Sequence, residues 1–158
     1  TRTAPAFTAT PLPPTARPTA TPAPRNDEIG YDVVLQYNNN GLTFINTSGG
    51  PLDITPLALV SRTLGQTFTG RFMGRYAQEP LTAIPANHCL QMWSFSLSQN
   101  PPPLPAQCDL LASGRSILRP GERFWLAHEF VVTYNRAIIA TCHAEALTCA
   151  FDLPQSEE

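Results

Sequence analysis

Four cysteines and three histidines carry the most distinctive chemistry in this chain. The cysteines are Cys89, Cys108, Cys142 and Cys149. Thiolates and imidazoles can bind zinc, a thiolate can act as a nucleophile, and two thiols can join in a disulfide. An even number of cysteines behind a Thr/Pro-rich segment favours disulfides and an oxidising, extracytoplasmic compartment.

The spacing of the cysteines favours two local bridges. Four cysteines allow three pairings, and we expect Cys89–Cys108 and Cys142–Cys149, because each pair is close in sequence and encloses an apparent loop. The Pro-rich segment 100–105 lies inside the first pair, and residues 143–148 inside the second are long enough for a hairpin loop. In the chain-entropy model each bridge would contribute roughly 2.5–3 kcal/mol.

A zinc site is the main alternative to the disulfides. His88 and His143 could complete a ligand set with the cysteines. Structural zinc sites usually contain C-x₂₋₄-C pairs, whereas the intervals here are 18 and 6 residues. We therefore expect no metal and no cofactor, and free thiols remain the third alternative.

Two pairs of adjacent residues suggest catalysis, but each lacks a feature that the chemistry requires. His128-Glu129 begins like a zinc-protease motif, but Val132 occupies the position of the second histidine. Cys142-His143 could suggest a nucleophile and its base, but adjacent residues of a strand point to opposite faces. The pattern favours a non-enzymatic protein. An exported hydrolase with a carboxylate pair is the enzymatic alternative, and the twelve acidic residues do not single out such a pair.

Aromatic and basic residues supply the candidate binding site. Trp93, Trp125 and Tyr76, with Arg71 and Arg75, could form a patch for a sugar or an anionic ligand. The alternative is that the tryptophans pack in the core and the arginines are solvated on a surface loop. The expected partners are accordingly an unknown protein or a cell-surface glycan.

Composition divides the chain into three parts. Residues 1–25 contain 20 Thr, Pro or Ala residues, too few large apolar side chains to form a core, and we expect a disordered linker. Residues 26–154 form the expected domain and residues 155–158 an acidic tail. Residues 26–158 hold seven arginines against twelve acidic residues, a balance that gives no electrostatic basis for binding nucleic acid or an anionic membrane.

The sequence also bears on export. It contains no run of 18 apolar residues and no signal peptide. Because it opens inside the linker, we expect a fragment whose signal or membrane anchor lies upstream, so that contact with a membrane would be through that anchor. Residues 46–48, Asn-Thr-Ser, form a formal glycosylation sequon.

Alternating apolar residues predict an all-β fold. The extended segments that we expect cover residues 31–47 as a hairpin, 52–60, 89–95, 124–126, 130–142 as a second hairpin, and 149–153. Pro56 predicts an edge strand or a bulge, and three glycines between residues 63 and 79 favour mixed loop and strand over helix. Seven to eight short strands separated by turns are typical of an immunoglobulin-like β-sandwich.

Several of these segments resemble a known kind of module. The Thr/Pro run, residues 42–46, 49–52 and 89–93, and Phe151-Asp152-Leu153-Pro154 resemble extracytoplasmic modules of high-GC bacterial surface and sensor proteins. In general pattern they are also similar to immunoglobulin-like sandwiches of the lamin-tail kind. The chain departs from true immunoglobulin domains, where one long-range cysteine pair surrounds a tryptophan. The resemblance implies an extracytoplasmic sandwich and no catalytic residue.

These observations predict a non-enzymatic, extracytoplasmic interaction or spacer module at the cell surface. One alternative is a sensor domain of a membrane-anchored protein that binds carbohydrate or peptide. Edge strands would add a route to self-association by strand addition.

Overall fold

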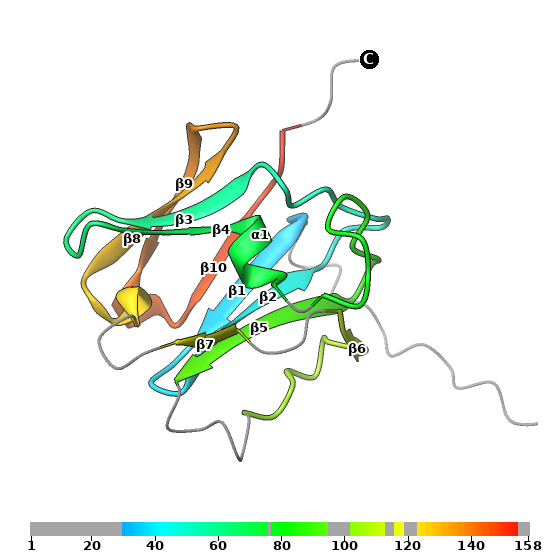
Figure 1. Cartoon of the computed structure of the whole chain (residues 1–158), viewed down its shortest axis with the longest axis horizontal. Coiled ribbons are helices and arrows are strands. Elements are labelled where there is room, and N and C mark those ends of the chain that lie inside the picture. Colours follow the sequence, from blue (N-terminus) through cyan, green and yellow to red (C-terminus); the bar gives the residue numbers. More distant parts are fainter. Residues whose placement is uncertain (1–29, 76, 95–101, 113–115, 119–122, 155–158) are drawn as a thin grey trace, which may run out of the picture.

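Two packed β-sheets make up the part of the chain that the computed structural model describes, which is residues 30–75, 77–94, 102–112, 116–118 and 123–154. Figure 1 shows the sheets as two layers with their strands running across the molecule. The prediction of an all-β sandwich is confirmed. The expected linker (1–25), the expected tail (155–158) and Tyr76 lie outside the described residues.

The larger sheet has the strand order β10-β1-β2-β5-β6, with β7 also beside β5. Its strands are β1 (Val33–Tyr37), β2 (Gly41–Asn46), β5 (His88–Ser94), β6 (Leu110–Leu111), β7 (Ser116–Leu118) and β10 (Thr148–Phe151). The smaller sheet has the order β4-β3-β8-β9. Its strands are β3 (Leu57–Ser61), β4 (Gln66–Thr69), β8 (Glu129–Tyr134) and β9 (Ala137–His143). The described residues also include the short helical turns α1 (Gly70–Met73), η3 (Phe124–Leu126) and η4 (Ala144–Ala146).

The described residues thus contain ten strands, more than the seven to eight expected. The additional strands are short. β6 and β7 have two and three residues and pair in parallel with β5. Strands of this length are too short to show an alternating pattern, so their pairing with β5 is visible only in the folded molecule.

Both predicted hairpins form, and turn residues explain each of them. Asn38 Oδ1 accepts hydrogen bonds from the backbone N–H groups of Asn40 and Gly41 at 2.7 and 3.2 Å, which closes the β1–β2 turn. Between β8 and β9, Asn135 and Arg136 both adopt positive φ, 49° and 70°. Two consecutive residues of positive φ are typical of the type I′ turn, whose twist matches that of the strands.

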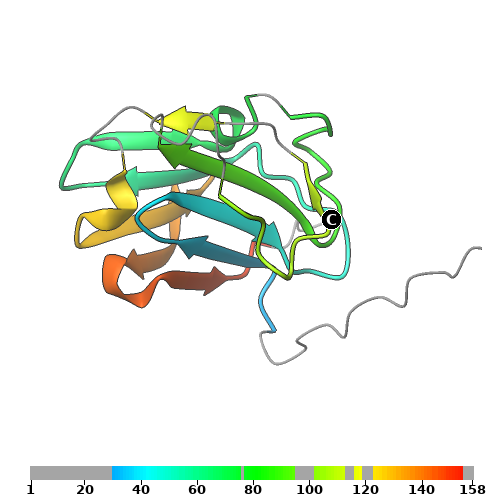
Figure 2. The same cartoon turned by 90° about the horizontal axis from the view of Figure 1, so that it is seen from below.

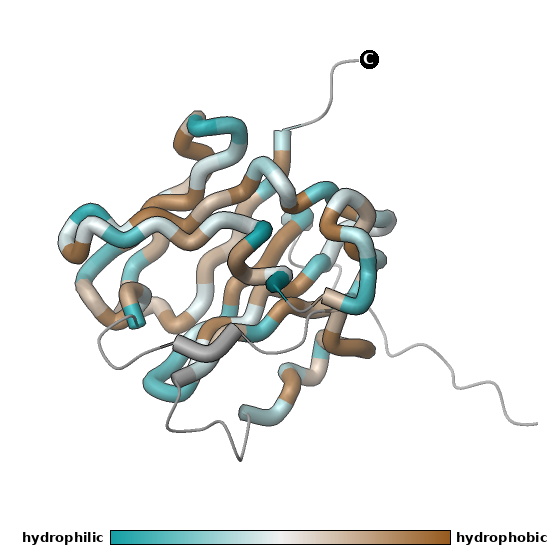
Figure 3. The backbone as a smooth tube through the Cα atoms, viewed as in Figure 1, coloured by the Kyte–Doolittle hydropathy of each residue, from teal (hydrophilic) through white to brown (hydrophobic). Residues whose placement is uncertain are grey.

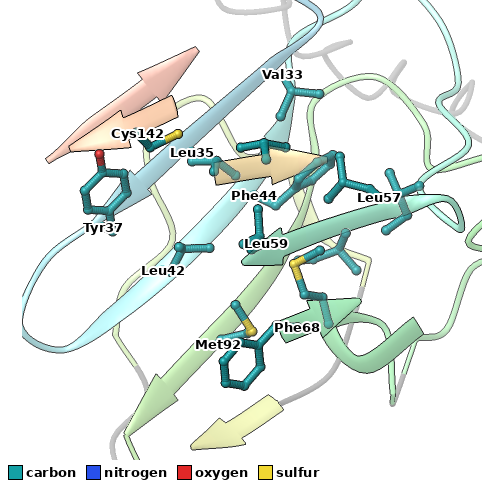
Figure 4. Packing of buried hydrophobic residues seen from close by; sticks show 14 of the residues in the cluster. Val33, Leu35, Tyr37, Leu42, Phe44, Leu57, Leu59, Phe68, Met92 and Cys142 are labelled. Carbon is teal, nitrogen blue, oxygen red and sulfur yellow. The ribbon is translucent and has the colours of Figure 1, made fainter. Parts of the chain in front are cut away.

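The core lies between the two sheets. Figure 4 shows Leu35 and Phe44 of the larger sheet pointing toward Leu59 of the smaller one, and all three are fully buried. Phe124 of η3 closes one end of this core, because its ring stacks on Phe68 at 4.7 Å and meets other aromatic rings edge to face. Figure 3 shows hydrophobic residues along the strands and hydrophilic ones in many of the turns.

The outer face of the larger sheet is also covered. Val34, Ile45 and Cys89 are paired across three strands on the face opposite the core, and all three are buried. The Cys89–Cys108 bridge holds residues 102–108 near this face, and Gln91 Nε2 donates a hydrogen bond to the Pro103 carbonyl at 3.4 Å. Residues 102–108 therefore form a third, partial layer.

Two expectations from the sequence are corrected. β3 is an interior strand between β4 and β8, and it begins at Leu57, directly after Pro56, so its ladder does not require the N–H that proline lacks. The Pro56 carbonyl accepts a hydrogen bond from the Asn135 N–H at 3.1 Å. The loop between Cys142 and Cys149 is not a hairpin loop, because β9 and β10 belong to different sheets.

The stretch 63–79 contains β4 and, directly after it, the single turn α1. Thr69 caps α1, accepting a hydrogen bond from the Phe72 N–H at 3.2 Å. Gly70 starts the turn because a Cβ there would overlap the Ile54 carbonyl oxygen. Mixed structure was expected here, but the helical turn was not.

Candidate functional site

Both predicted disulfides are present. Cys89 is bonded to Cys108 and Cys142 to Cys149, with Cα–Cα distances of 5.8 and 5.5 Å. None of the four cysteines is free. The bridges leave no thiolate to bind zinc or attack a substrate, and they are typical of proteins that fold in an oxidising compartment.

The second bridge also links the two sheets. Cys142 lies on β9 of the smaller sheet and Cys149 on β10 of the larger one. Beside it, the Tyr37 hydroxyl lies within hydrogen-bond distance of the carbonyls of His143 and Thr148, at 2.7 and 3.2 Å. Burial raises the pKa of this hydroxyl above its ordinary value of 10.0. The disulfide and the Tyr37 hydroxyl together hold the connection from β9 to β10 in place.

The two tryptophans lie on opposite faces of the larger sheet and are both buried, at 1% and 0% exposure. Trp125 belongs to the core, and its indole N–H donates to the Asn38 carbonyl at 2.8 Å. Trp93 pairs with Gly41 on the outer face, and its indole nitrogen has no hydrogen-bond partner among the described residues. The structure does not bring the two rings together on one open surface.

The predicted arginines lie on and beside α1. Arg71 and Arg75 are exposed, and the neighbouring Phe72 contacts Phe68 with ring centroids 5.1 Å apart. This placement fits a solvated turn packed on the edge of the core. With Tyr76 outside the described residues, a shared aromatic and basic patch stays a prediction.

A shallow depression of about 370 Å³ lies elsewhere, where the two ends of the domain meet. It is lined by Asp32, residues 48–53, Tyr134, Leu153 and Pro154. The lining comes from four separate segments, so no motif in the sequence marks it. It includes two carboxylates and no basic side chain.

The carboxylates of the depression are already partly engaged. Asp53 Oδ1 accepts hydrogen bonds from the N–H and hydroxyl of Thr55 at 2.8 and 2.6 Å. Asp32 Oδ2 accepts the Leu153 N–H at 3.1 Å. Burial, followed by the charge of Asp53, raises the pKa of Tyr134. The depression can therefore accept hydrogen bonds from hydroxyl or amino groups.

The histidines do not assemble a site among the described residues. His88 Nδ1 lies 2.8 Å from Glu79 Oε2, a pair about one-fifth exposed. Across the part of the chain with assigned positions, no three His, Cys, Asp or Glu side chains are grouped so as to hold a metal ion. Asn46 of the sequon is fully buried and donates to two carbonyls, so the folded domain does not present it for glycosylation.

Within the described ranges, no helix has the length and apolar character needed to cross a membrane. Comparisons of the chain with protein-family models, curated proteins and solved structures found no match. The resemblance to bacterial surface and sensor modules, and to immunoglobulin-like sandwiches, therefore stays a prediction.

Proposed function

We propose that this chain is a non-enzymatic, extracytoplasmic module that acts as an interaction or spacer domain at the cell surface. The observation that carries the proposal is the pair of disulfides, one of which joins the two sheets. A sandwich cross-linked in this way suits an environment that keeps thiols oxidised.

The start of β1 and the end of β10 lie side by side, which supports a module that is attached through one end of the sandwich. The Asp32 N–H donates to Asp152 Oδ1 at 3.1 Å, and the Leu153 N–H donates to Asp32 Oδ2 at 3.1 Å. This reciprocal pair holds the start of β1 beside the end of β10. A Thr/Pro linker before residue 30 would attach at this end and leave the other end of the sandwich free.

The depression beside these ends favours the sensor domain as a second candidate. Its carboxylates and the Tyr134 ring are the kinds of group that bind sugar hydroxyls and the apolar face of a sugar ring. Titration with a panel of neutral mono- and disaccharides, followed by amide chemical shifts, tests it. Shifts confined to Asp32, residues 48–53 and Tyr134 would support a sugar site, and unchanged spectra at saturating sugar would contradict it.

The leading proposal is tested on protein isolated from its native host. Fractionation should place it outside the cytoplasm, with an intact mass lower by the four hydrogens that two disulfides remove. Peptide mapping should return Cys89–Cys108 and Cys142–Cys149. Four free thiols, or a cytoplasmic location, would overturn the proposal.

A further inference from the structure

β9 forms one edge of the smaller sheet, and no described strand pairs with its outer side. Figure 2 shows β9 and β10 together along one side of the sandwich, but β10 belongs to the larger sheet. β9 has seven residues, whereas the edge strands β4 and β10 have four each. It is the longest edge strand in the described part of the chain, and its outer backbone groups can pair with another strand.

The backbone groups of Ile138 and Thr141 point away from β8. The Tyr37 hydroxyl lies 2.7 Å from the His143 carbonyl, so that carbonyl points outward. Backbone groups two residues apart in a strand point the same way, so Thr141 also faces outward. Ala137 pairs with β8 directly after the two-residue turn, so the next residue, Ile138, faces outward too. Neither Ile138 nor Thr141 has a backbone partner on that side among the described residues.

β9 lacks most of the features that keep an edge strand from pairing. Residues 137–142 contain no charged side chain and no proline. Ile138 is 53% exposed, although it is a large apolar residue. The one protective feature is a bulge at Ile139, which follows from the pairing of Val132 with Ala140 and of Thr133 with Ile138. Without like charges along the edge, nothing repels an identical strand.

Opposite charges lie at the two ends of β9. Arg136 directly precedes the strand and Glu145 follows it by two residues, and both side chains are exposed. Neither makes an ion pair with any other described residue. Antiparallel pairing brings the start of one strand beside the end of the other, so Arg136 of each copy would lie near Glu145 of the other. The edge is therefore complementary to itself in both hydrogen bonding and charge.

We propose that β9 pairs in antiparallel orientation with β9 of a second copy of this chain. The inference rests on the proposed function as an interaction module and names its partner. A two-fold axis at Thr141 places Thr141 opposite itself. The extra residue of the bulge then lets Ile138 lie opposite His143 of the second copy, with Arg136 and Glu145 meeting beyond them. This register uses the outward-facing residues of the strand and joins two four-stranded sheets into one continuous sheet.

Sedimentation equilibrium of the oxidised full chain tests this pairing. The wild type should form dimers as its concentration rises. Thr141 is exposed, and Thr141→Lys or Thr141→Glu should each weaken the dimer by about tenfold or more, because each change places like charges opposite one another across the two-fold axis. An equimolar mixture of the two variants should associate again as a heterodimer. Such recovery requires that both variants are folded, and it identifies Thr141 as the residue that meets its own copy.

Amide hydrogen exchange gives a second measurement on the wild type. The N–H groups of Ile138 and Thr141 should exchange quickly in dilute protein, because they have no partner in the monomer. Their exchange should slow as the dimer fraction rises. Unchanged exchange at both residues in a dimeric sample would place the contact elsewhere and overturn the inference.

Thr67→Lys is the matched control, because Thr67 is also an exposed threonine and lies on β4, the opposite edge of the same sheet. It should leave the dimer intact. Loss of the dimer in this control, with retention in the Thr141 variants, would assign association to β4 and overturn the inference. A wild type that stays monomeric at about 1 mM would overturn it as well. A monomer with both disulfides intact contradicts only this inference, whereas free thiols in protein from the native host contradict the proposed function.

Discussion

The buried side chain of Asn46 fixes the loop that follows β2. Its Nδ2 donates to the carbonyls of Gly50 and Ile84 at 2.9 and 2.8 Å, and its Oδ1 accepts from the Ser48 N–H and hydroxyl. Asn46→Ala removes all these bonds at a position that is fully buried. We expect urea denaturation to show a loss of about 2–4 kcal/mol in the free energy of unfolding.

Asn39→Ala is the control for that substitution, because the Asn39 side chain is exposed. It should change the free energy of unfolding by no more than about 0.5 kcal/mol. If the two variants were equally stable, the loop would not depend on the Asn46 amide.

The positive φ of Leu147 makes a second prediction at this scale. Leu147→Gly removes the steric cost of the left-handed conformation, and this gain exceeds the added freedom of glycine in the unfolded chain. The net effect should be a stabilisation of up to about 1 kcal/mol, measured by thermal unfolding. Leu147→Ala retains the strain and should bring no gain. Equal stability of the two variants would show that the turn is not strained.

At the level of elements, the two disulfides should contribute different amounts to the free energy of unfolding. The Cys89–Cys108 bridge spans 19 residues and the Cys142–Cys149 bridge spans 7. Loop entropy alone predicts about 3.2 kcal/mol for the first and about 2.4 kcal/mol for the second. We expect the double alanine variant of the shorter bridge to lose more than its loop predicts, because Cys142 is fully buried and joins the sheets.

Denaturation of the two double variants without reductant measures this difference. A loss for the Cys142/Cys149 variant below the loop-entropy value would show that the sheets stay docked without their covalent link. The outcome decides whether the bridge or the surrounding core holds β9 beside β10.

Elements with a clear local signal were predicted well. The alternation from Phe130 to Tyr134, followed by Asn135-Arg136, fixes a hairpin by side-chain period and turn chemistry alone. β6, β7 and α1 were missed because segments of two to four residues have no measurable period. Their structure depends on contacts with β5 and on the close approach of Gly70 to Ile54.

For the whole molecule, the raised pKa values of the buried Tyr37 and the partly buried Tyr134 predict how the free energy of unfolding depends on pH. Burial raises the pKa of Tyr37, and burial together with Asp53 raises that of Tyr134, from 10.0. In the unfolded chain these hydroxyls ionise near pH 10, so the folded state holds more protons above that value. The stability that they contribute is complete below pH 10 and is lost as pH rises through the folded pKa values.

Tyr37→Phe tests this dependence. The variant should be less stable at neutral pH, because the hydroxyl bonds to His143 and Thr148 are lost. Its stability should also fall less steeply than that of the wild type between about pH 9 and 11 in urea denaturation. A slope equal to that of the wild type would show that Tyr37 does not contribute to alkaline unfolding.

The candidate sites show the limit of sequence reasoning at this scale. Trp93 and Trp125 were singled out as possible core or site residues, and their burial depends on which face of β5 and which end of the core they occupy. Residues 124–126 were expected to be extended, but they form the 3₁₀ turn η3. The depression was not predicted. It is assembled from segments that are far apart along the chain, and spacing in a sequence does not encode that proximity.

The sequence by itself determined the all-β class, the two hairpins and the pairing of the cysteines, because each rests on local periodicity, turn residues or short loops. Only the tertiary structure decided that β9 and β10 lie in different sheets and that β3 is an interior strand. The reason is physical: local patterns set the conformation of a segment, whereas docking of two sheets is set by long-range burial summed over the whole core.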